Sequence, residues 1–260
     1  MKKFLLTCFL TLGLTTSLTA LAEKNSLHGF YLGAGAGYSW QNIDLDNTQT
    51  FQNSGANRFV VKDSKNISQD LGLGQLFLGY GFNRGILYLG TELGFNLYQE
   101  GESFKLFNQF NSIPNSFDAT VKNYTGKVSP KYGFQLTFLP GLYITPTTLM
   151  YGRVGGALTR YDTDSNTSVN QTVSPEISDK PNSDTNWVPE IIIGAGIRQQ
   201  IWKNLSARVD YSYSQSAKFS GATATINKPV GDKAIRESKA DYKLQSNNLM
   251  FSVIYNLPDL

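Results

Sequence analysis

The sequence of 260 residues contains a single cysteine and a single histidine. Cys8 lies in a leader segment described below, so the rest of the chain has no disulfide and no thiol nucleophile. Most hydrolytic sites need a histidine beside a serine or carboxylates, and His28 stands alone at the start of a predicted strand. The usual ligand set for a transition metal is also missing. We therefore expect no catalytic residue, no metal and no cofactor, and predict that the protein is not an enzyme.

Long apolar runs and an excess of one charge are also missing. No stretch after residue 22 has the ~18–20 unbroken apolar residues that a membrane-spanning helix requires. The 23 basic residues, less Lys2 and Lys3 of the leader, face 20 acidic residues. A near-neutral exported chain has no electrostatic basis for binding nucleic acid.

The first 22 residues have the layout of a secretory signal peptide. Lys2 and Lys3 form a positive end, residues 4–14 are mostly apolar, and Ala20-Leu21-Ala22 has the small-x-small pattern of a cleavage site. A membrane-anchoring helix is disfavoured because the apolar part is short and rich in threonine. We predict cleavage after Ala22, which leaves residues 23–260 as one exported domain.

Segments of roughly ten residues then alternate between apolar and small or polar side chains, which is the pattern of strands with two different faces. The clearest segment places Leu87, Leu89, Leu93, Phe95 and Leu97 opposite Tyr88, Gly90, Glu92, Gly94 and Asn96. We predict eight strands, near residues 30–39, 70–82, 87–97, 132–138, 148–160, 190–198, 205–213 and 248–257. The second is less regular, and its alternation fails around Gln75–Phe77, which suggests a bulge there.

The connections alternate between short and long. Short links are predicted at Asn83–Gly85, Pro140–Thr147 and Trp202–Asn204, and long polar loops at Gln41–Gln69, Gln99–Lys127, Tyr161–Asn186 and Gln215–Asn247. Long loops that all emerge at one end are typical of an outer-membrane barrel with short periplasmic turns. The fold class that we predict is an all-β, eight-stranded antiparallel up-and-down transmembrane β-barrel with four long extracellular loops.

A soluble two-sheet sandwich would also alternate, so the chemistry of the two faces decides between the folds. The apolar face carries almost no charge at strand centres, as contact with hydrocarbon demands, and the second face is rich in glycine, as in a narrow barrel interior. Aromatic residues gather at two levels, as in a membrane girdle. Its predicted members are Tyr38, Trp40, Tyr98, Trp187, Tyr211 and Tyr213 at one level, and Phe30, Tyr80, Trp202 and Tyr255 at the other.

These segments resemble the small outer-membrane β-barrel family, which comprises opacity-type surface antigens and OmpA/OmpX-like barrels. The resemblance rests on Gly29–Gly33, Leu78–Phe82, Leu205–Tyr213 and the last strand. It implies a bacterial outer-membrane location, contact with outer-membrane lipid and lipopolysaccharide, and assembly by the insertion machinery. Members are similar in ending on an aromatic residue that this machinery reads, whereas here Leu260 is last and the nearest outward aromatic is Tyr255.

Six charged residues fall on the glycine-rich inner face: Glu92, Arg153, Glu190, Arg198, Arg208 and Asp210. A three-residue turn between the sixth and seventh strands would place Arg198 directly opposite Arg208, where like charges repel unless carboxylates intervene. Asp210 is the diagonal neighbour, and Glu92 could approach across the lumen. This interior charge network is either a structural plug or an ion gate, and eight strands leave no room for a wide channel.

The predicted function depends on the loops, because loops held by a rigid scaffold commonly carry function. An apolar patch in the second loop, consisting of Phe104, Leu106, Phe107, Phe110 and Phe117, could bind a partner or pack on the barrel rim. The leading hypothesis is a non-enzymatic surface protein with a structural, surface-antigen or adhesin-like role toward a host or surface partner. A narrow ion or small-solute channel, an envelope-lipid-modifying enzyme and a soluble periplasmic carrier are the alternatives.

Overall fold

A computed structural model of the protein describes residues 27–52, 58–101, 103–108, 119–171, 182–221, 224–227 and 235–258. In these residues eight strands form a ring, as predicted, and three shorter strands lie beside it. The ring consists of β1 (Gly29–Gln52), β2 (Arg58–Arg84), β3 (Leu87–Tyr98), β5 (Ala119–Thr145), β6 (Thr148–Gln171), β7 (Asn182–Gln200), β8 (Leu205–Ser216) and β11 (Ile235–Asn256). The shorter strands are β4 (Ser103–Asn108), β9 (Phe219–Ser220) and β10 (Ala224–Asn227).

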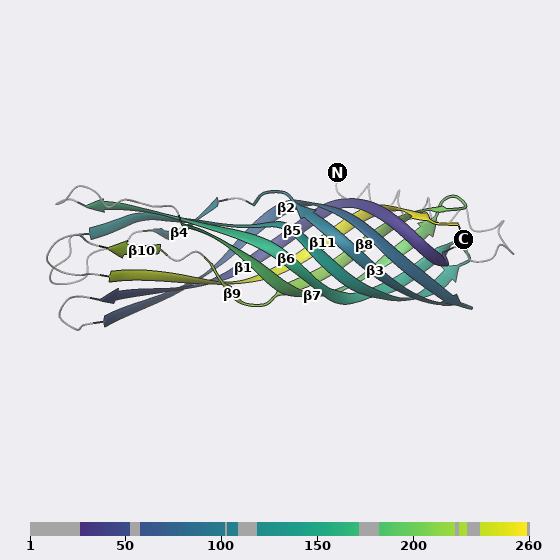
Figure 1. Ribbon diagram of the computed structural model, residues 1–260, viewed down its shortest axis with the longest axis horizontal. Coiled ribbons are helices and arrows are strands. Elements are labelled where there is room, and N and C mark those ends of the chain that lie inside the picture. The colour runs from purple at the N-terminus through teal and green to yellow at the C-terminus, as the bar shows by residue number, and fades with distance from the viewer. Residues whose placement is uncertain are drawn as a thin grey trace, which may run out of the picture.

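The ring is closed because the last strand returns to the first. Each strand of the ring is antiparallel to the one before it, and β11 pairs with β1 from Tyr31↔Asn256 to Gln52↔Ile235. Closure satisfies backbone groups between neighbouring strands and removes the exposed edges of a sheet, as a lipid environment requires. Figure 1 shows the tilted strands of this barrel, with paired strands extending from one of its ends.

The turns at the opposite end are short. Gly85 and Ile86 connect β2 to β3, and Gly85 has a φ of 63°, a conformation that glycine adopts at low cost. The bend at Trp202–Asn204 connects β7 to β8, as predicted. The link predicted from Pro140 was wrong, because β5 continues to Thr145 and the turn to β6 occupies only residues 146 and 147.

The bulge predicted around Gln75–Phe77 is also wrong. The pairing of β2 with β1 runs without a shift through this region, and Leu73, Gln75 and Phe77 are all buried inside the barrel. The alternation is therefore preserved, but large apolar side chains occupy inward positions where the sequence led us to expect small ones. Irregularities occur instead in β5, at Val121/Asn123, Pro130/Tyr132 and Tyr143/Thr145.

The largest difference between prediction and structure concerns the long loops. The predicted loop Gln41–Gln69 consists mostly of strand, because β1 and β2 remain paired up to Gln52↔Arg58. The described parts of the predicted loops Gln99–Lys127, Tyr161–Asn186 and Gln215–Asn247 likewise contain strand residues, including β4, β9 and β10. Polar side chains obscured these strands, since both faces of a ribbon outside the membrane can be polar, whereas backbone pairing continues regardless of the side chains.

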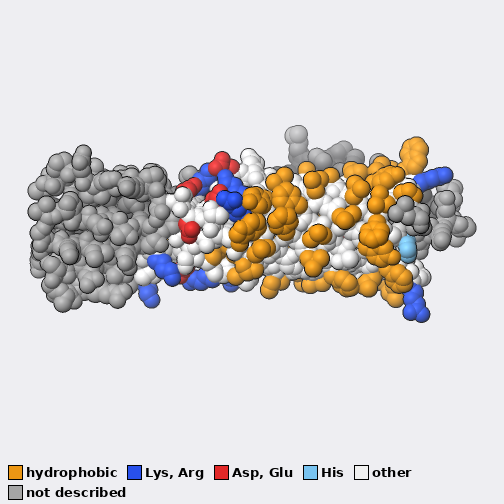
Figure 2. Space-filling view, in the orientation of Figure 1, with side chains coloured by type: hydrophobic (Ala, Val, Ile, Leu, Met, Phe, Trp, Pro, Cys, Tyr) orange, Lys and Arg blue, Asp and Glu red, His pale blue; other side chains and the backbone are white. Residues whose placement is uncertain are grey.

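The outer surface carries a broad apolar band. Figure 2 shows hydrophobic side chains over the visible face of the barrel, with acidic and basic side chains gathered at its border with the extension. Leu136 in β5 is 62% exposed and Ile191 in β7 is 73% exposed. Such exposure on every strand of a closed barrel indicates a lipid-facing surface.

The outward aromatic residues border this band. Tyr38 and Trp40 are in contact near the extension, with ring centroids 5.1 Å apart, and Phe30 and Tyr80 are 4.9 Å apart near the short turns. The other outward members of the predicted girdle are Trp187, Trp202, Tyr211, Tyr213 and Tyr255. Tyr98 was placed in the girdle wrongly: it follows Asn96 on the inward face of β3 and lines an interior cavity.

The predicted signal peptide, residues 1–22, lies outside the described residues. No helix in the described ranges is long and apolar enough to cross a membrane.

Candidate functional site

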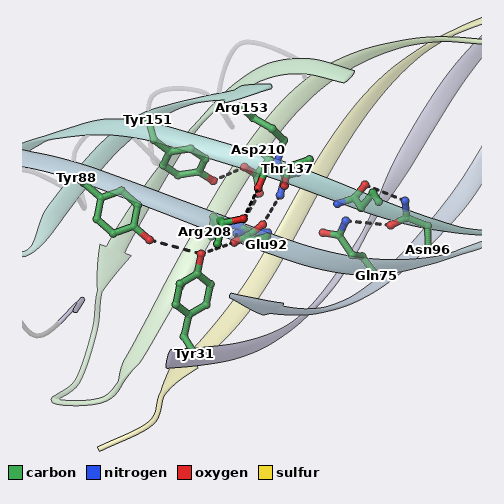
Figure 3. Close-up of polar contacts among 12 residues, drawn as sticks. Tyr31, Gln75, Tyr88, Glu92, Asn96, Thr137, Tyr151, Arg153, Arg208 and Asp210 are labelled. Atoms are coloured by element: carbon green, nitrogen blue, oxygen red, sulfur yellow. Dashed lines mark hydrogen bonds and ion pairs between the residues drawn. The ribbon is translucent and has the colours of Figure 1, made fainter. Parts of the chain in front are cut away.

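Glu92 lies at the centre of the barrel interior and is fully buried. One of its carboxylate oxygens accepts a hydrogen bond from Arg153 at 2.7 Å, and the other is paired with Arg208. The hydroxyl of Tyr31 donates a further hydrogen bond to Glu92 at 2.9 Å. Strands β1, β3, β6 and β8 are thus tied together across the lumen at one carboxylate (Figure 3).

Arg208 extends the network to a second carboxylate. Its Nε lies 2.7 Å from Oδ2 of Asp210, and the hydroxyl of Tyr151 donates to Oδ1 of Asp210. The guanidinium of Arg208 also stacks over the ring of Phe77, 4.0 Å from its centroid. Buried arginine is suited to this position because its planar group can bind carboxylates and stack on an aromatic ring together.

Two of the six predicted interior charges lie apart from these contacts. Arg198 is directly opposite Arg208, as expected, but its Nη2 donates to Oδ1 of Asn256 at 2.5 Å and its guanidinium lies over the ring of Tyr31. Glu190 lies nearer the extension and accepts a hydrogen bond from Tyr161 at 2.8 Å. The network around Glu92 therefore contains four of the six charges.

A layer of polar side chains lies next to this network, on the side toward the extension. The amide of Gln75 donates to Asn96 at 2.9 Å, and the amide of Asn96 donates to Gln135 at 3.0 Å. These side chains line a cavity of about 20 Å³ together with Tyr98 and Glu190. That volume is enough for about one water molecule, and a polar cavity of this size is a place for bound water.

Apolar clusters fill the interior on both sides. The cluster near the short turns consists of Leu27, Tyr88, Leu139, Leu149 and Tyr151. The cluster toward the extension consists of Ile43, Leu45, Val128, Tyr161, Val188, Ala240, Tyr242 and Leu244, with Phe219 packed between the rings of Tyr161 and Tyr242. Six of the eight residues of the second cluster, all except Val128 and Val188, lie in segments that the sequence had suggested were loops.

The network and the two clusters together fill the described lumen. Among the described residues this interior leaves no wide aqueous passage, and the ion pairs connect strands that are far apart around the ring. The sequence analysis did not name Tyr31, Tyr151, Gln75 and Gln135 as hydrogen-bonding residues of this interior. Their inward positions in the alternation were the available signal.

The remaining predicted sites are placed as follows. His28 is exposed beside the short turns, with its ring 6.2 Å from that of Tyr80. The predicted apolar patch is only partly described: β4 contains Phe104, Leu106 and Phe107, but the structure does not describe their side chains. Phe110 and Phe117 lie outside the described residues. Among the described residues, no group of three or more histidine, cysteine and acidic side chains could hold a metal.

Charged contacts also occur on the outside of the extension. Lys127 and Lys131 donate to the carboxylate of Glu100 at 2.6 and 3.3 Å, and these bonds hold the pKa of Glu100 below its ordinary value. Lys218 lies 2.7 Å from Asp46, and that hydrogen bond raises the pKa of its ammonium group. These groups are solvated, so salt weakens their interactions.

A closed antiparallel barrel with a filled interior, which contains a buried charge network, and an apolar, aromatic-bordered exterior defines a small transmembrane β-barrel protein. A family model described as the OmpA-like transmembrane domain matches residues 25–230. The chain belongs to this family, and it is an outer-membrane β-barrel. None of the curated proteins matches the sequence.

Solved structures of similar barrels are also known. Neisserial surface protein A is 11% identical, with 88% of this chain and 97% of that chain covered and a TM-score of 0.37. Ail, the attachment invasion locus protein of Yersinia pestis, is 11% identical, with 85% and 99% covered and a TM-score of 0.29. The outer membrane protease OmpT from Escherichia coli is 8% identical, with 92% and 99% covered and a TM-score of 0.49. Family membership rests on the family model and not on these likenesses.

Proposed function

We propose that this protein is a non-enzymatic outer-membrane barrel that acts as a surface antigen or adhesin-like protein. Its functional part is the extension, the paired strand segments that lie beyond the extracellular aromatic residues. The observation that carries the proposal is the length of the paired strands. The pairing of β1 with β2 continues from Trp40↔Asp70 at the border of the apolar band to Gln52↔Arg58. An ordered ribbon of this kind presents side chains on a rigid support, which favours recognition.

The filled interior argues against the channel alternative. The ion pairs of Glu92 with Arg153 and Arg208 cross the lumen, and an apolar cluster closes it toward the extension. Moving an ion through this cluster would remove its hydration without offering it polar ligands. We therefore expect purified protein in a planar bilayer to show no steady conductance.

The chemistry of the interior argues against the enzyme alternative. The buried carboxylates of Glu92 and Asp210 are engaged by arginine and tyrosine, so neither is positioned to accept a proton from a substrate. His28 lies beside the short turns, at the opposite end from the extension. We expect unaltered lipid A and phospholipids in an overexpressing strain.

The proposed role predicts partners at the surface. These are outer-membrane lipid and lipopolysaccharide around the barrel, the insertion machinery during assembly, and a host or surface partner at the extension.

Truncation of individual hairpins tests the proposal directly. In one variant an Asn-Gly turn joins Asp46 to Ser64, which face each other across β1 and β2, and in another it joins Asp164 to Ser183 across β6 and β7. We expect at least one truncation to abolish attachment of expressing bacteria to host cells, while the barrel remains inserted. If bacteria that express the full-length protein attach no better than a strain that lacks it, the adhesin-like role is contradicted.

A further inference from the structure

A groove lies on the lipid-facing surface near the short turns. It has a volume of about 670 Å³, within the range of ~300–1,000 Å³ that is typical of small-molecule sites. Its lining is almost entirely apolar, and Arg84 is the charged residue on its margin. Nothing in the proposed surface role accounts for this feature.

The groove arises from a row of small outward side chains across neighbouring strands. Pro140 in β5, Gly152 in β6 and Ala195 in β7 form its floor, and Gly152 pairs directly with Ala195. On the side toward the short turns lies a row of larger residues, Leu87, Leu142 and Met150, which pair with one another across β3, β5 and β6. On the other side lie Phe138, Val154 and Ile193.

The ladder of paired residues between β5 and β6 is also interrupted at this position. The ladder between β5 and β6 includes Phe138↔Val154 and Gly141↔Tyr151, but neither Leu139 nor Pro140 is paired with β6. Proline has no N–H to donate to a neighbouring strand. A Cβ atom added to Gly152 would lie no closer than 3.8 Å to any neighbour, so the space above this residue is open.

Arg84 supplies the second part of the site. It ends β2 at the edge of the apolar band, where it pairs with Leu87 and is exposed. No ion pair links Arg84 to an acidic side chain among the described residues, so its charge is available at the level of the lipid headgroups. A guanidinium group is well suited to phosphate because it can donate two parallel hydrogen bonds.

We propose that this groove is a binding site for one phospholipid of the periplasmic leaflet. An acyl chain lies over Pro140, Gly152 and Ala195, and the headgroup phosphate is bound by Arg84. The place of the groove favours a phospholipid over lipopolysaccharide, because the short turns face the periplasm in barrels of this family and lipopolysaccharide belongs to the opposite leaflet.

The test is native mass spectrometry of the full chain purified from bacterial outer membranes in a mild detergent. We expect the wild-type barrel to retain one phospholipid. Gly152→Leu fills the groove without a backbone clash, and it should lose that phospholipid. Arg84→Gln removes the phosphate contact and should weaken retention by about fivefold, the effect of one basic residue at a lipid surface.

Matched variants on other strands serve as controls. Ala207→Leu enlarges an outward small residue of β8, and Lys203→Gln removes a charge from the turn between β7 and β8; neither residue lines the groove. Both variants should retain the phospholipid, and a heat-dependent shift in gel mobility checks that each barrel is folded. Three outcomes overturn the proposal: a wild-type barrel without phospholipid, equal retention by wild type and Gly152→Leu, or a retained mass that corresponds to lipopolysaccharide.

Discussion

Arg198 and Arg208 lie directly opposite each other in the β7–β8 pair, yet only Arg208 is bound by carboxylates. Arg198 instead uses the amide oxygen of Asn256 and the face of the Tyr31 ring. The like charges are therefore accommodated by different surroundings. Glu92 and Asp210 are therefore the acidic residues that balance the buried charge of Arg208.

Replacement of Glu92 with alanine should strongly destabilise the folded barrel. The change leaves Arg153 and Arg208 buried without their shared partner, and loss of one member of a buried pair costs about 3–5 kcal/mol. Urea-induced unfolding in lipid vesicles measures this free energy. Lys218→Ala, which removes an exposed ion pair with Asp46, is the control and should leave the unfolding midpoint unchanged.

Replacement of Asp210 with alanine should lower the melting temperature, because Arg208 and Tyr151 lose an acceptor. Tyr151→Phe removes one hydrogen bond to the same carboxylate and should cost about 1 kcal/mol. A double-mutant cycle with both changes should show that they are not additive. An unchanged melting temperature for Asp210→Ala would show that the contacts of Asp210 do not stabilise the barrel.

Two glycines of β2 distinguish the inside of the barrel from the outside. A Cβ atom at Gly79 would lie 2.3 Å from the ring of Tyr31, whereas one at Gly74 would lie no closer than 3.9 Å to any neighbour. We expect Gly79→Ala to destabilise the barrel by about 1–3 kcal/mol through overpacking. Gly74→Ala should be neutral or slightly stabilising in the same unfolding measurement. Equal effects would mean that the assignment of faces in β2 is wrong.

A charge in the apolar band should oppose membrane insertion. Leu136 is an outward residue midway along the apolar part of β5. Leu136→Arg should reduce the free energy of folding into vesicles by about 2–4 kcal/mol, as expected for arginine near the midplane of a bilayer. Leu136→Ala is the size control and should cost less. If both variants fold equally well, the surface around Leu136 does not face hydrocarbon.

Much of the fold follows from short-range patterns. The alternation of β3 assigns Leu93 to the lipid and Glu92 to the lumen, because successive side chains of a strand point to opposite faces. The turn at Gly85 follows from the low cost of a positive φ at glycine. The same patterns do not reveal that Phe77 points inward or that polar segments such as Asp44–Thr48 are paired strands.

The sequence by itself determined the existence of the eight strands, the faces of the regular ones such as β3, and the turns at Gly85 and Trp202–Asn204, since each depends on residues that are neighbours along the chain. Only the tertiary structure decided which charges meet, because Glu92 and Arg208 are 116 residues apart and come together through the closure and tilt of the ring. It likewise decided the groove at Gly152, which exists because small residues on three separate strands share one level. Contacts across a barrel depend on register, and register becomes visible only when every strand has a partner.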